Sequence, residues 1–214
     1  MQDGLKFTMF TEIKTILGLL AGFITLAAFF PYIFSTIKGK TKPERATWWI
    51  WALNSVLLLT SYRAEGAQET IWLAVAYTFG CVTVGLFTIK YGIGGWTKLD
   101  RFSLVGSIIA VISWIIIGPL ATFIASLLID LFGVTPTIYR SFYHPEEEDK
   151  LSWIMWFIGA FLSLLLVDNI YVWQEWSLET LIIAAYPAQI TITTAIIVWF
   201  LSREKLKHSP RKID

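Results

Sequence analysis

Charged residues are scarce in this sequence, and their scarcity excludes a soluble protein. Only 15% of the 214 residues are charged while 56% are apolar, and the mean hydropathy is +0.62. A soluble domain has about 25% charged residues, so this composition is typical of a membrane protein. The net charge of +1 provides no basic field that would attract nucleic acid. We therefore expect an integral protein of the lipid bilayer with no nucleic-acid partner.

Cysteine and histidine are also nearly absent. The only cysteine, Cys81, lies in an apolar stretch, which excludes an intrachain disulfide and fits a small packed side chain. The two histidines, His144 and His208, stand alone in polar segments without metal-ligand spacing. A glycine-rich phosphate loop, a nucleophile elbow and a nucleophile and base pair in register are missing too. We predict no metal, no cofactor and no enzymatic activity.

Long uncharged stretches give the number of helices. A hydrocarbon core of about 30 Å needs about 20 helical residues, with about 17 as a lower limit. Residues 102–139 carry one charge, Asp130, and are too long for one span. Gly118-Pro119 predicts a turn there, because proline is tolerated in a first helical turn and not in an interior. The uncharged stretches then predict an all-α polytopic membrane protein with seven transmembrane helices: 15–37, 46–62, 70–89, 102–129 with 131–139 divided at the turn, 151–167 and 180–202.

The distribution of lysine and arginine predicts the orientation, because these residues accumulate in cytoplasmic loops. With seven helices and the N-terminus outside, fourteen of the seventeen basic residues lie inside, including those of a cytoplasmic tail, 203–214. If Gly118-Pro119 only kinked one long helix, just seven of the basic residues would lie inside. A cleaved signal peptide is disfavoured, because Lys14 precedes an apolar run that reaches Ile37. A bacterial cell membrane is the expected location.

Aromatic and acidic residues near the helix ends have ordinary interpretations. Interfacial tryptophans are common at both membrane surfaces. The acidic run 146–149 is expected to be a solvated cap that favours the dipole of the following helix. The tryptophans predicted for the inner boundary are Trp48, Trp49, Trp153 and Trp199, and those for the outer boundary are Trp72, Trp173 and Trp176.

An internal repeat occurs at an offset of 105 residues. Residues 31–60, PYIFSTIKGKTKPERATWWIWALNSVLLLT, align without a gap over residues 136–165, PTIYRSFYHPEEEDKLSWIMWFIGAFLSLL. A single helix between two three-helix units reverses the chain direction once more, so both units have the same orientation in the membrane. We predict a first repeat at 12–92, a linker helix at 100–118 and a second repeat at 119–202, a 3+1+3 arrangement. The aligned pairs include Pro31 with Pro136, Trp48 with Trp153, Trp51 with Trp156, and more loosely Ala76-Tyr77 with Ala185-Tyr186.

This plan, with a proline in the inner half of each unit's first helix, resembles the PQ-loop and SWEET-like proteins of the transporter-opsin-G-protein-receptor superfamily. The sequence departs from their pattern, since Tyr32 and Thr137 follow Pro31 and Pro136 where the family has glutamine. The second helix of each unit also lacks the SWEET-like proline, so no branch is assigned. Pnu-type vitamin transporters share a related plan. The resemblance implies transport by alternating access, with Pro31 and Pro136 as hinges.

Asp130 is the first candidate for function, because a charge within a membrane helix costs about 2.5–3.5 kcal/mol on insertion scales. It belongs to a polar stripe at helical spacing that includes Ser126, with Gly133 on the same side. Such a stripe indicates a face turned to the bundle interior or to a wet cavity. Asp130 could bind a solute or exchange a proton. Alternatively, hydroxyl groups hold it and it only associates helices.

Two further sets of residues could line a substrate site. In the last helix, Tyr186 and Gln189 flank Pro187, whose missing N–H frees a carbonyl for a ligand or for Gln189 itself. In the second helix of each unit, Trp51 is one turn from Asn54, and Trp156 is the equivalent tryptophan. An aromatic wall beside an amide suits a polar solute with an apolar side, whereas helix packing is the alternative role.

The leading hypothesis is a transporter that moves a small polar solute, such as a sugar, amino acid or vitamin, between its two repeats. Proton coupling through Asp130 is a secondary hypothesis. The alternative is a seven-helix receptor or sorting protein that uses the same cavity to sense a ligand. Because the chain carries both repeats, either a monomer or a homo-oligomer is compatible with the sequence.

Overall fold

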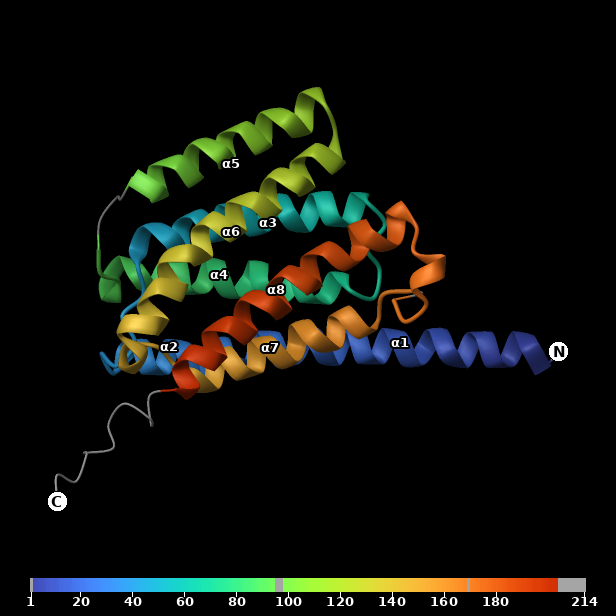
Figure 1. Ribbon diagram of the computed structural model, residues 1–214, viewed down its shortest axis with the longest axis horizontal. Coiled ribbons are helices and arrows are strands. Elements are labelled where there is room, and N and C mark those ends of the chain that lie inside the picture. The colour runs from blue at the N-terminus through green and yellow to red at the C-terminus, as the bar shows by residue number, and fades with distance from the viewer. Residues whose placement is uncertain (1, 95–97, 169, 204–214) are drawn as a thin grey trace, which may run out of the picture.

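Helices form almost all of the chain. The computed structural model describes residues 2–94, 98–168 and 170–203, and within them the only strand-like feature is an isolated bridge between Glu44 and Ile93. The long helices run side by side as a bundle (Figure 1). They are α1 (Gln2–Ala27), α2 (Phe29–Ile37), α3 (Arg45–Ala64), α4 (Ile71–Tyr91), α5 (Lys98–Ile116), α6 (Pro119–Tyr143), α7 (Lys150–Leu165) and α8 (Leu178–Ser202), with short 3₁₀ turns at Pro145–Glu147 and Trp173–Glu175.

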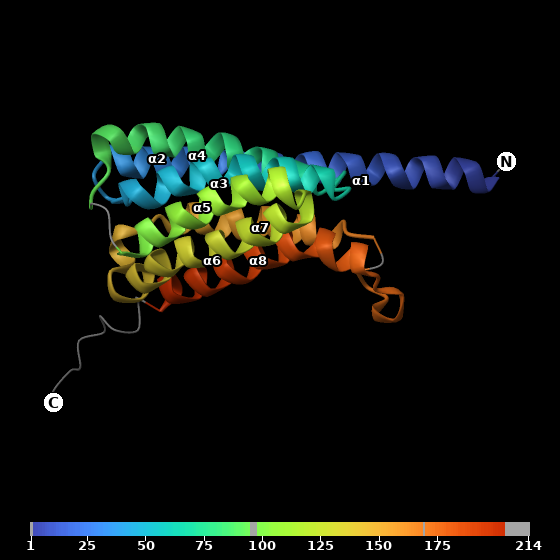
Figure 2. The same cartoon turned by 90° about the horizontal axis from the view of Figure 1, so that it is seen from above.

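Helices α1 and α2 form one rod that is interrupted at Ala28. Pro31 has no backbone N–H to donate to the carbonyl of Ala27, so the helical ladder is broken one turn before it. The rod begins at Gln2, well before the predicted start after Lys14, and its N-terminal part projects beyond the other helices (Figure 2). The seven rods match the seven predicted helices in number and order.

The predicted turn at Gly118-Pro119 is confirmed. Gly118 has a φ of 125°, which a residue with a Cβ adopts only with strain, and Pro119 stands in the first turn of α6. Helix α6 then folds back along α5, and the Thr122 hydroxyl donates to the carbonyl oxygen of Ala110 at 3.1 Å. The alternative of one kinked helix is therefore wrong.

The outer surface of the bundle is apolar, and several polar side chains are buried among the apolar residues of its interior. Phe30, Phe79 and Ile115 are 74%, 66% and 78% exposed, whereas Thr25, Asn54 and Ser126 are fully buried. A soluble protein seldom exposes such large apolar surfaces. Among the described residues, four rods are long and apolar enough to cross a bilayer: Glu12–Ile37, α4, α6 and α8. The apolar parts of α5 and α7 are shorter, and α3 carries Arg45 and Arg63 near its ends.

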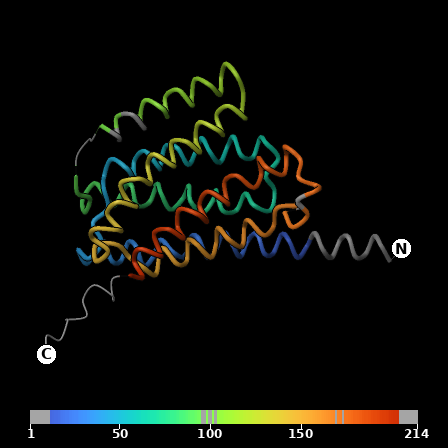
Figure 3. The backbone as a smooth tube through the Cα atoms, in the orientation of Figure 1, coloured from blue at the N-terminus to red at the C-terminus, as the bar shows by residue number. Residues whose placement is uncertain are grey.

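For description, α1–α4 are called the first helix group and α6–α8 the second. In one group α4 lies against both α1 and α3, and in the other α8 lies against both α6 and α7. Between the groups, α1 packs on α7 and α3 packs on α6, while α5 covers α6 and α3. The α2–α3 and α6–α7 connections lie at the same end of the bundle, and the N-terminus lies at the opposite end (Figure 3).

Glycine allows the closest of these helix contacts. A Cβ on Gly22 would lie 2.8 Å from the carbonyl oxygen of Trp72, so α1 can approach α4 only where this side chain is absent. The ring of Phe29 occupies the space that a Cβ on Gly80 would need. The sequence places Gly18 and Gly22 four residues apart, and their role in the structure is close helix packing.

Candidate functional site

A cavity lies between the two helix groups. About 60 Å³ of this cavity admits the centre of a water molecule. One water needs about 10–15 Å³ by that measure, so the cavity holds a few waters. Helices α3, α4, α6, α7 and α8 all contribute to its lining: Trp48, Trp51, Ser55, Leu58, Tyr77, Cys81, Asp130, Val134, Trp153, Trp156, Tyr186, Gln189, Ile190, Thr193 and Thr194.

Asp130 is the only charged residue in that lining. The side-chain amide of Asn54 donates to its Oδ1 at 2.8 Å and to the carbonyl oxygen of Ser126 at 3.0 Å, which ties α3 to α6. Within the described part of the chain, Asp130 forms no ion pair and its Oδ2 has no hydrogen-bond partner. One carboxylate oxygen is therefore fixed by the scaffold while the other remains available to a ligand.

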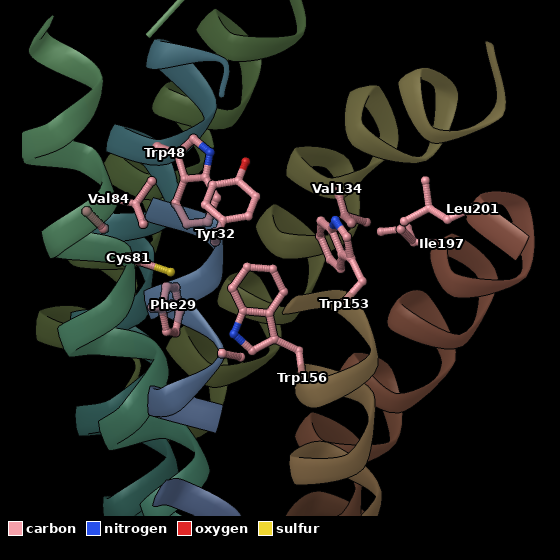
Figure 4. Packing of buried hydrophobic residues seen from close by; sticks show 12 residues of the cluster. Phe29, Tyr32, Trp48, Cys81, Val84, Val134, Trp153, Trp156, Ile197 and Leu201 are labelled. Carbon is pink, nitrogen blue, oxygen red and sulfur yellow. The ribbon is translucent and has the colours of Figure 1, made fainter. Parts of the chain in front are cut away.

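Tryptophans from α3 and α7 form much of the wall. The Trp48 and Trp51 rings are 5.2 Å apart, and the Trp153 and Trp156 rings are 4.8 Å apart. Figure 4 shows Trp48 on one side of the bundle interior and Trp153 and Trp156 on the other. Trp51 lies against α6 at Gly133, where a Cβ would be 2.5 Å from its Nε1. Trp156 both lines the cavity and packs fully buried among neighbouring rings.

The carbonyl that is freed by the proline of α8 already has a hydrogen-bond donor within the protein. Pro187 leaves the carbonyl of Ile183 without its helical donor. The Tyr62 hydroxyl of α3 lies 2.7 Å from this oxygen and donates to it, and it lies 2.8 Å from the Thr70 hydroxyl. Neither Gln189 nor a ligand is needed to satisfy the carbonyl. Gln189 and Tyr186 still line the cavity, one turn away from each other.

We expect Tyr62→Phe to lower the free energy of unfolding by about 1–2 kcal/mol, because it leaves the buried Ile183 carbonyl without a donor. Thermal unfolding of the detergent-purified protein measures this change. Tyr171→Phe is the matched control, since the Tyr171 hydroxyl also donates to a carbonyl, that of Leu165, but from an exposed side chain. Equal effects of the two substitutions would contradict the assignment.

Ion pairs close the cavity at the end that carries the α2–α3 and α6–α7 connections, here called the ion-pair end. Lys42 donates to Oε1 of Glu147 at 2.6 Å, and Arg140 donates to Oε2 of the same carboxylate at 2.6 Å. Arg140 also lies 3.5 Å from Glu44. These partners lower the pKa of Glu147, with the hydrogen bond from Lys42 as the largest cause. The network joins the first helix group to the second.

Glu148 lies beneath that network. Its Oε2 accepts a hydrogen bond from Nε1 of Trp153 at 3.0 Å, and both residues line a small space of about 10 Å³ between the ion pairs and the main cavity. Burial raises the pKa of Glu148 to about 7, although the Trp153 hydrogen bond and Arg140 oppose the shift. Glu147 and Asp149, the other nearby carboxylates, raise it further.

Glu148 should make stability depend on pH. The pKa of Glu148 is higher in the folded protein than in the unfolded chain. Its contribution to the free energy of unfolding is therefore fully present below about pH 4.5 and is lost as pH rises through about 7. Glu148→Gln keeps an acceptor for Trp153 and cannot ionise. The variant and the wild type should have the same free energy of unfolding near about pH 5.5. Near about pH 8.5 the variant should be about 1–2 kcal/mol more stable, a value that is reduced for solvent screening because Glu148 is partly exposed. Thermal unfolding at both values tests this, and parallel pH profiles would contradict it.

The opposite end of the cavity is closed by an aromatic group. The Tyr62 ring stacks on Phe123 with centroids 5.4 Å apart, and it meets Tyr186 edge to face at 5.6 Å. These rings come from α3, α6 and α8 and pack with Leu58 and Leu73. Side chains from both helix groups therefore bound the cavity at each end.

The structure brings most of the predicted site residues together. Asp130, Trp51, Trp156, Tyr186 and Gln189 line one cavity. Asn54 and Ser126 are fully buried directly behind Asp130 rather than in the lining. The three candidate hinges lie in different surroundings: Pro31 follows the break at Ala28, Pro136 lies inside α6 and Pro187 lies inside α8.

Two predictions made for residues near the helix ends are wrong. Trp48 and Trp153 are only 4% and 5% exposed and line the cavity, whereas Trp49 and Trp199 are 39% and 50% exposed as interfacial tryptophans are. Neighbouring positions on a helix point about 100° apart, so Trp48 faces inward while Trp49 faces outward. The alignment of the two buried tryptophans with each other in the internal repeat was the sequence signal that could have indicated their inward position.

The acidic run 146–149 is not simply a solvated cap. Asp149 does cap α7, accepting from the Ser152 backbone N–H at 2.8 Å. Glu147 and Glu148 are instead bound by Arg140 and Trp153. The sequence reasoning also missed Tyr77, which the repeat aligns with Tyr186, and Cys81 as parts of the cavity wall.

No protein-family model, curated protein or solved structure matches the chain.

Proposed function

We propose that the chain consists of two parallel three-helix units, α1–α4 and α6–α8, joined by α5 as a linker, as in the PQ-loop and SWEET-like plan. The packing supports this proposal, because exchanging the units maps the main helix contacts within and between them onto one another. The third helix lies between the first two in both units, and the contact of α1 with α7 corresponds to that of α6 with α3.

Residues that are 105 positions apart support the same symmetry. Asn54 of α3 bonds to the Ser126 carbonyl and to Asp130 of α6. The equivalent residue Gly159 of α7 lies against the Ala21 carbonyl and the Thr25 hydroxyl of α1, which are the equivalents of Ser126 and Asp130. Lys42 and Glu147, also 105 apart, bond to each other, as residues on a twofold axis do.

The proposed function is transport of a small polar solute across a membrane by alternating access. The observation that carries it is the cavity between the units, closed at one end by ion pairs and at the other by aromatic rings, with side chains from both units at each closure. Rocking of one unit against the other would open one closure while the other stays shut. The basic residues at the ion-pair end support placing it on the cytoplasmic side, with the N-terminus outside.

Ligand binding and flux are the test. The purified protein is screened by thermal unfolding against sugars, amino acids, amines, nucleosides and vitamins, where a ligand at about a hundred times its Kd stabilises by about 2.7 kcal/mol. The stabilising solute is then offered to proteoliposomes. Uptake that depends on the protein supports transport. Binding without flux would overturn it and favour the receptor or sorting alternative, which uses the cavity to sense a ligand.

A further inference from the structure

We propose that the central cavity binds a small organic cation that carries an ammonium group with N–H donors, with Asp130 as its counter-ion. This inference rests on the proposed function, because it names the solute class for the same cavity. Three properties of the lining carry it: one uncompensated negative charge, a wall of aromatic rings and serine and threonine oxygens that can only accept.

The charge comes from Asp130. No lysine, arginine or histidine lines the cavity within the described part of the chain. The Asn54 amide contributes a dipole at Oδ1 but no charge. An isolated carboxylate within a membrane bundle is costly, so a ligand that brings one positive charge gains the most from binding there. A neutral solute would leave that charge uncompensated.

The aromatic wall suits a cation as well. The π-faces of tryptophan and tyrosine attract ammonium groups, with tryptophan the best of the side chains. Rings from α3, α4, α7 and α8 line the same cavity as Asp130, and the Tyr77 ring lies 6.4 Å from both Trp156 and Tyr186. The lining combines them with four tryptophans: Trp48, Trp51, Trp153 and Trp156.

The serine and threonine hydroxyls of the lining offer lone pairs rather than protons. Ser55 donates to the carbonyl of Ala52 at 2.9 Å, and Thr194 donates to that of Ile190 at 2.6 Å. Thr193 donates to the carbonyl of Gln189 at 2.9 Å. With their protons used within their own helices, these oxygens can only accept from a ligand. These three oxygens add acceptors for the N–H donors of an ammonium group.

Cys81 provides a direct test because it is the only cysteine of the chain and lines the cavity. Four methanethiosulfonates of similar size are compared: aminoethyl, trimethylammonioethyl, hydroxyethyl and sulfonatoethyl. Each rate is divided by the rate of the same reagent with free mercaptoethanol. We expect the normalised rate of the aminoethyl reagent to exceed that of the sulfonatoethyl reagent by at least about tenfold. It should exceed that of the trimethylammonioethyl reagent by a smaller factor, because of these two cations only the aminoethyl group has N–H donors.

The matched variants are Asp130→Asn, which keeps the shape and removes the charge, and Asp130→Glu, which keeps the charge. The preference should fall to that of free thiol in Asp130→Asn and persist in Asp130→Glu. If Asp130→Asn does not fold, the wild-type ratios alone decide: equal normalised rates for cationic, neutral and anionic reagents would overturn the inference. That result would leave the transport proposal intact, which fails separately if a bound solute shows no flux.

Discussion

Glu147→Lys is expected to raise the rate at which Cys81 reacts with a membrane-impermeant maleimide about tenfold from the ion-pair end. The substitution removes the acceptor shared by Lys42 and Arg140 and places a third positive charge beside them. Single exposed ion pairs contribute only about 0.2–1 kcal/mol, but loss of two pairs with added repulsion can shift an opening equilibrium by the roughly 1.4 kcal/mol that a tenfold change needs. Labelling in proteoliposomes of known orientation measures the reaction rate of Cys81 from the ion-pair end alone.

Glu146→Lys is the matched control for this prediction. It makes the same change in net charge one position away, where the carboxylate faces only His144 at 3.6 Å. Its labelling rate should stay near that of the wild type. If both variants accelerate labelling equally, general electrostatics rather than the closure explains the effect. If neither does, the ion pairs do not hold the cavity shut.

Trp156→Ala is expected to lower the free energy of unfolding by about 3 kcal/mol. Its ring centroid lies 4.9 Å from that of Phe29 and 5.4 Å from that of Tyr32, so it joins α7 to α2 across the two helix groups. Truncating a buried tryptophan costs about 3–5 kcal/mol in soluble proteins. The lower value applies here because helix association in a bilayer depends on packing rather than on transfer from water.

Chemical unfolding in detergent measures this loss. Trp199→Ala is the control, because Trp199 is 50% exposed and its ring is contacted mainly by the Arg203 guanidinium at 3.5 Å. That variant should lose less than about 1 kcal/mol. Equal losses would mean that Trp156 is not a packing centre. Trp156→Phe, which keeps an aromatic ring, should fall between the wild type and Trp156→Ala.

Hydropathy and charge predicted the helices because these properties are local. Uncharged stretches located every rod, and Gly118-Pro119 located the hairpin of α5 and α6. The early start of α1 at Gln2 escaped prediction, since helix continues past the point where hydrophobicity ends. Among the residues that the structure describes, four rods qualify as membrane spans on length and composition, because α3, α5 and α7 are shorter or more polar.

The site was partly predictable because polar residues within apolar helices face a common interior. That argument located Asp130 and Gln189 but not their partners. The bond from Tyr62 to the Ile183 carbonyl depends on how α3 crosses α8, which no local pattern records. The contact between Lys42 and Glu147 could have been found, because residues at equivalent positions of two symmetric units can meet at the axis.

The pair of Lys42 and Glu147 also has an evolutionary meaning. Two identical three-helix chains in a symmetric dimer would place the same side chain on both sides of the axis, so lysine would oppose lysine. On the proposed two-unit plan, an ion pair there is possible only because the two units differ in sequence. The same difference places Thr25 at the position equivalent to Asp130, so one polypeptide carries one carboxylate where identical units would carry none or two. A binding stoichiometry of one cation for each polypeptide follows from this asymmetry.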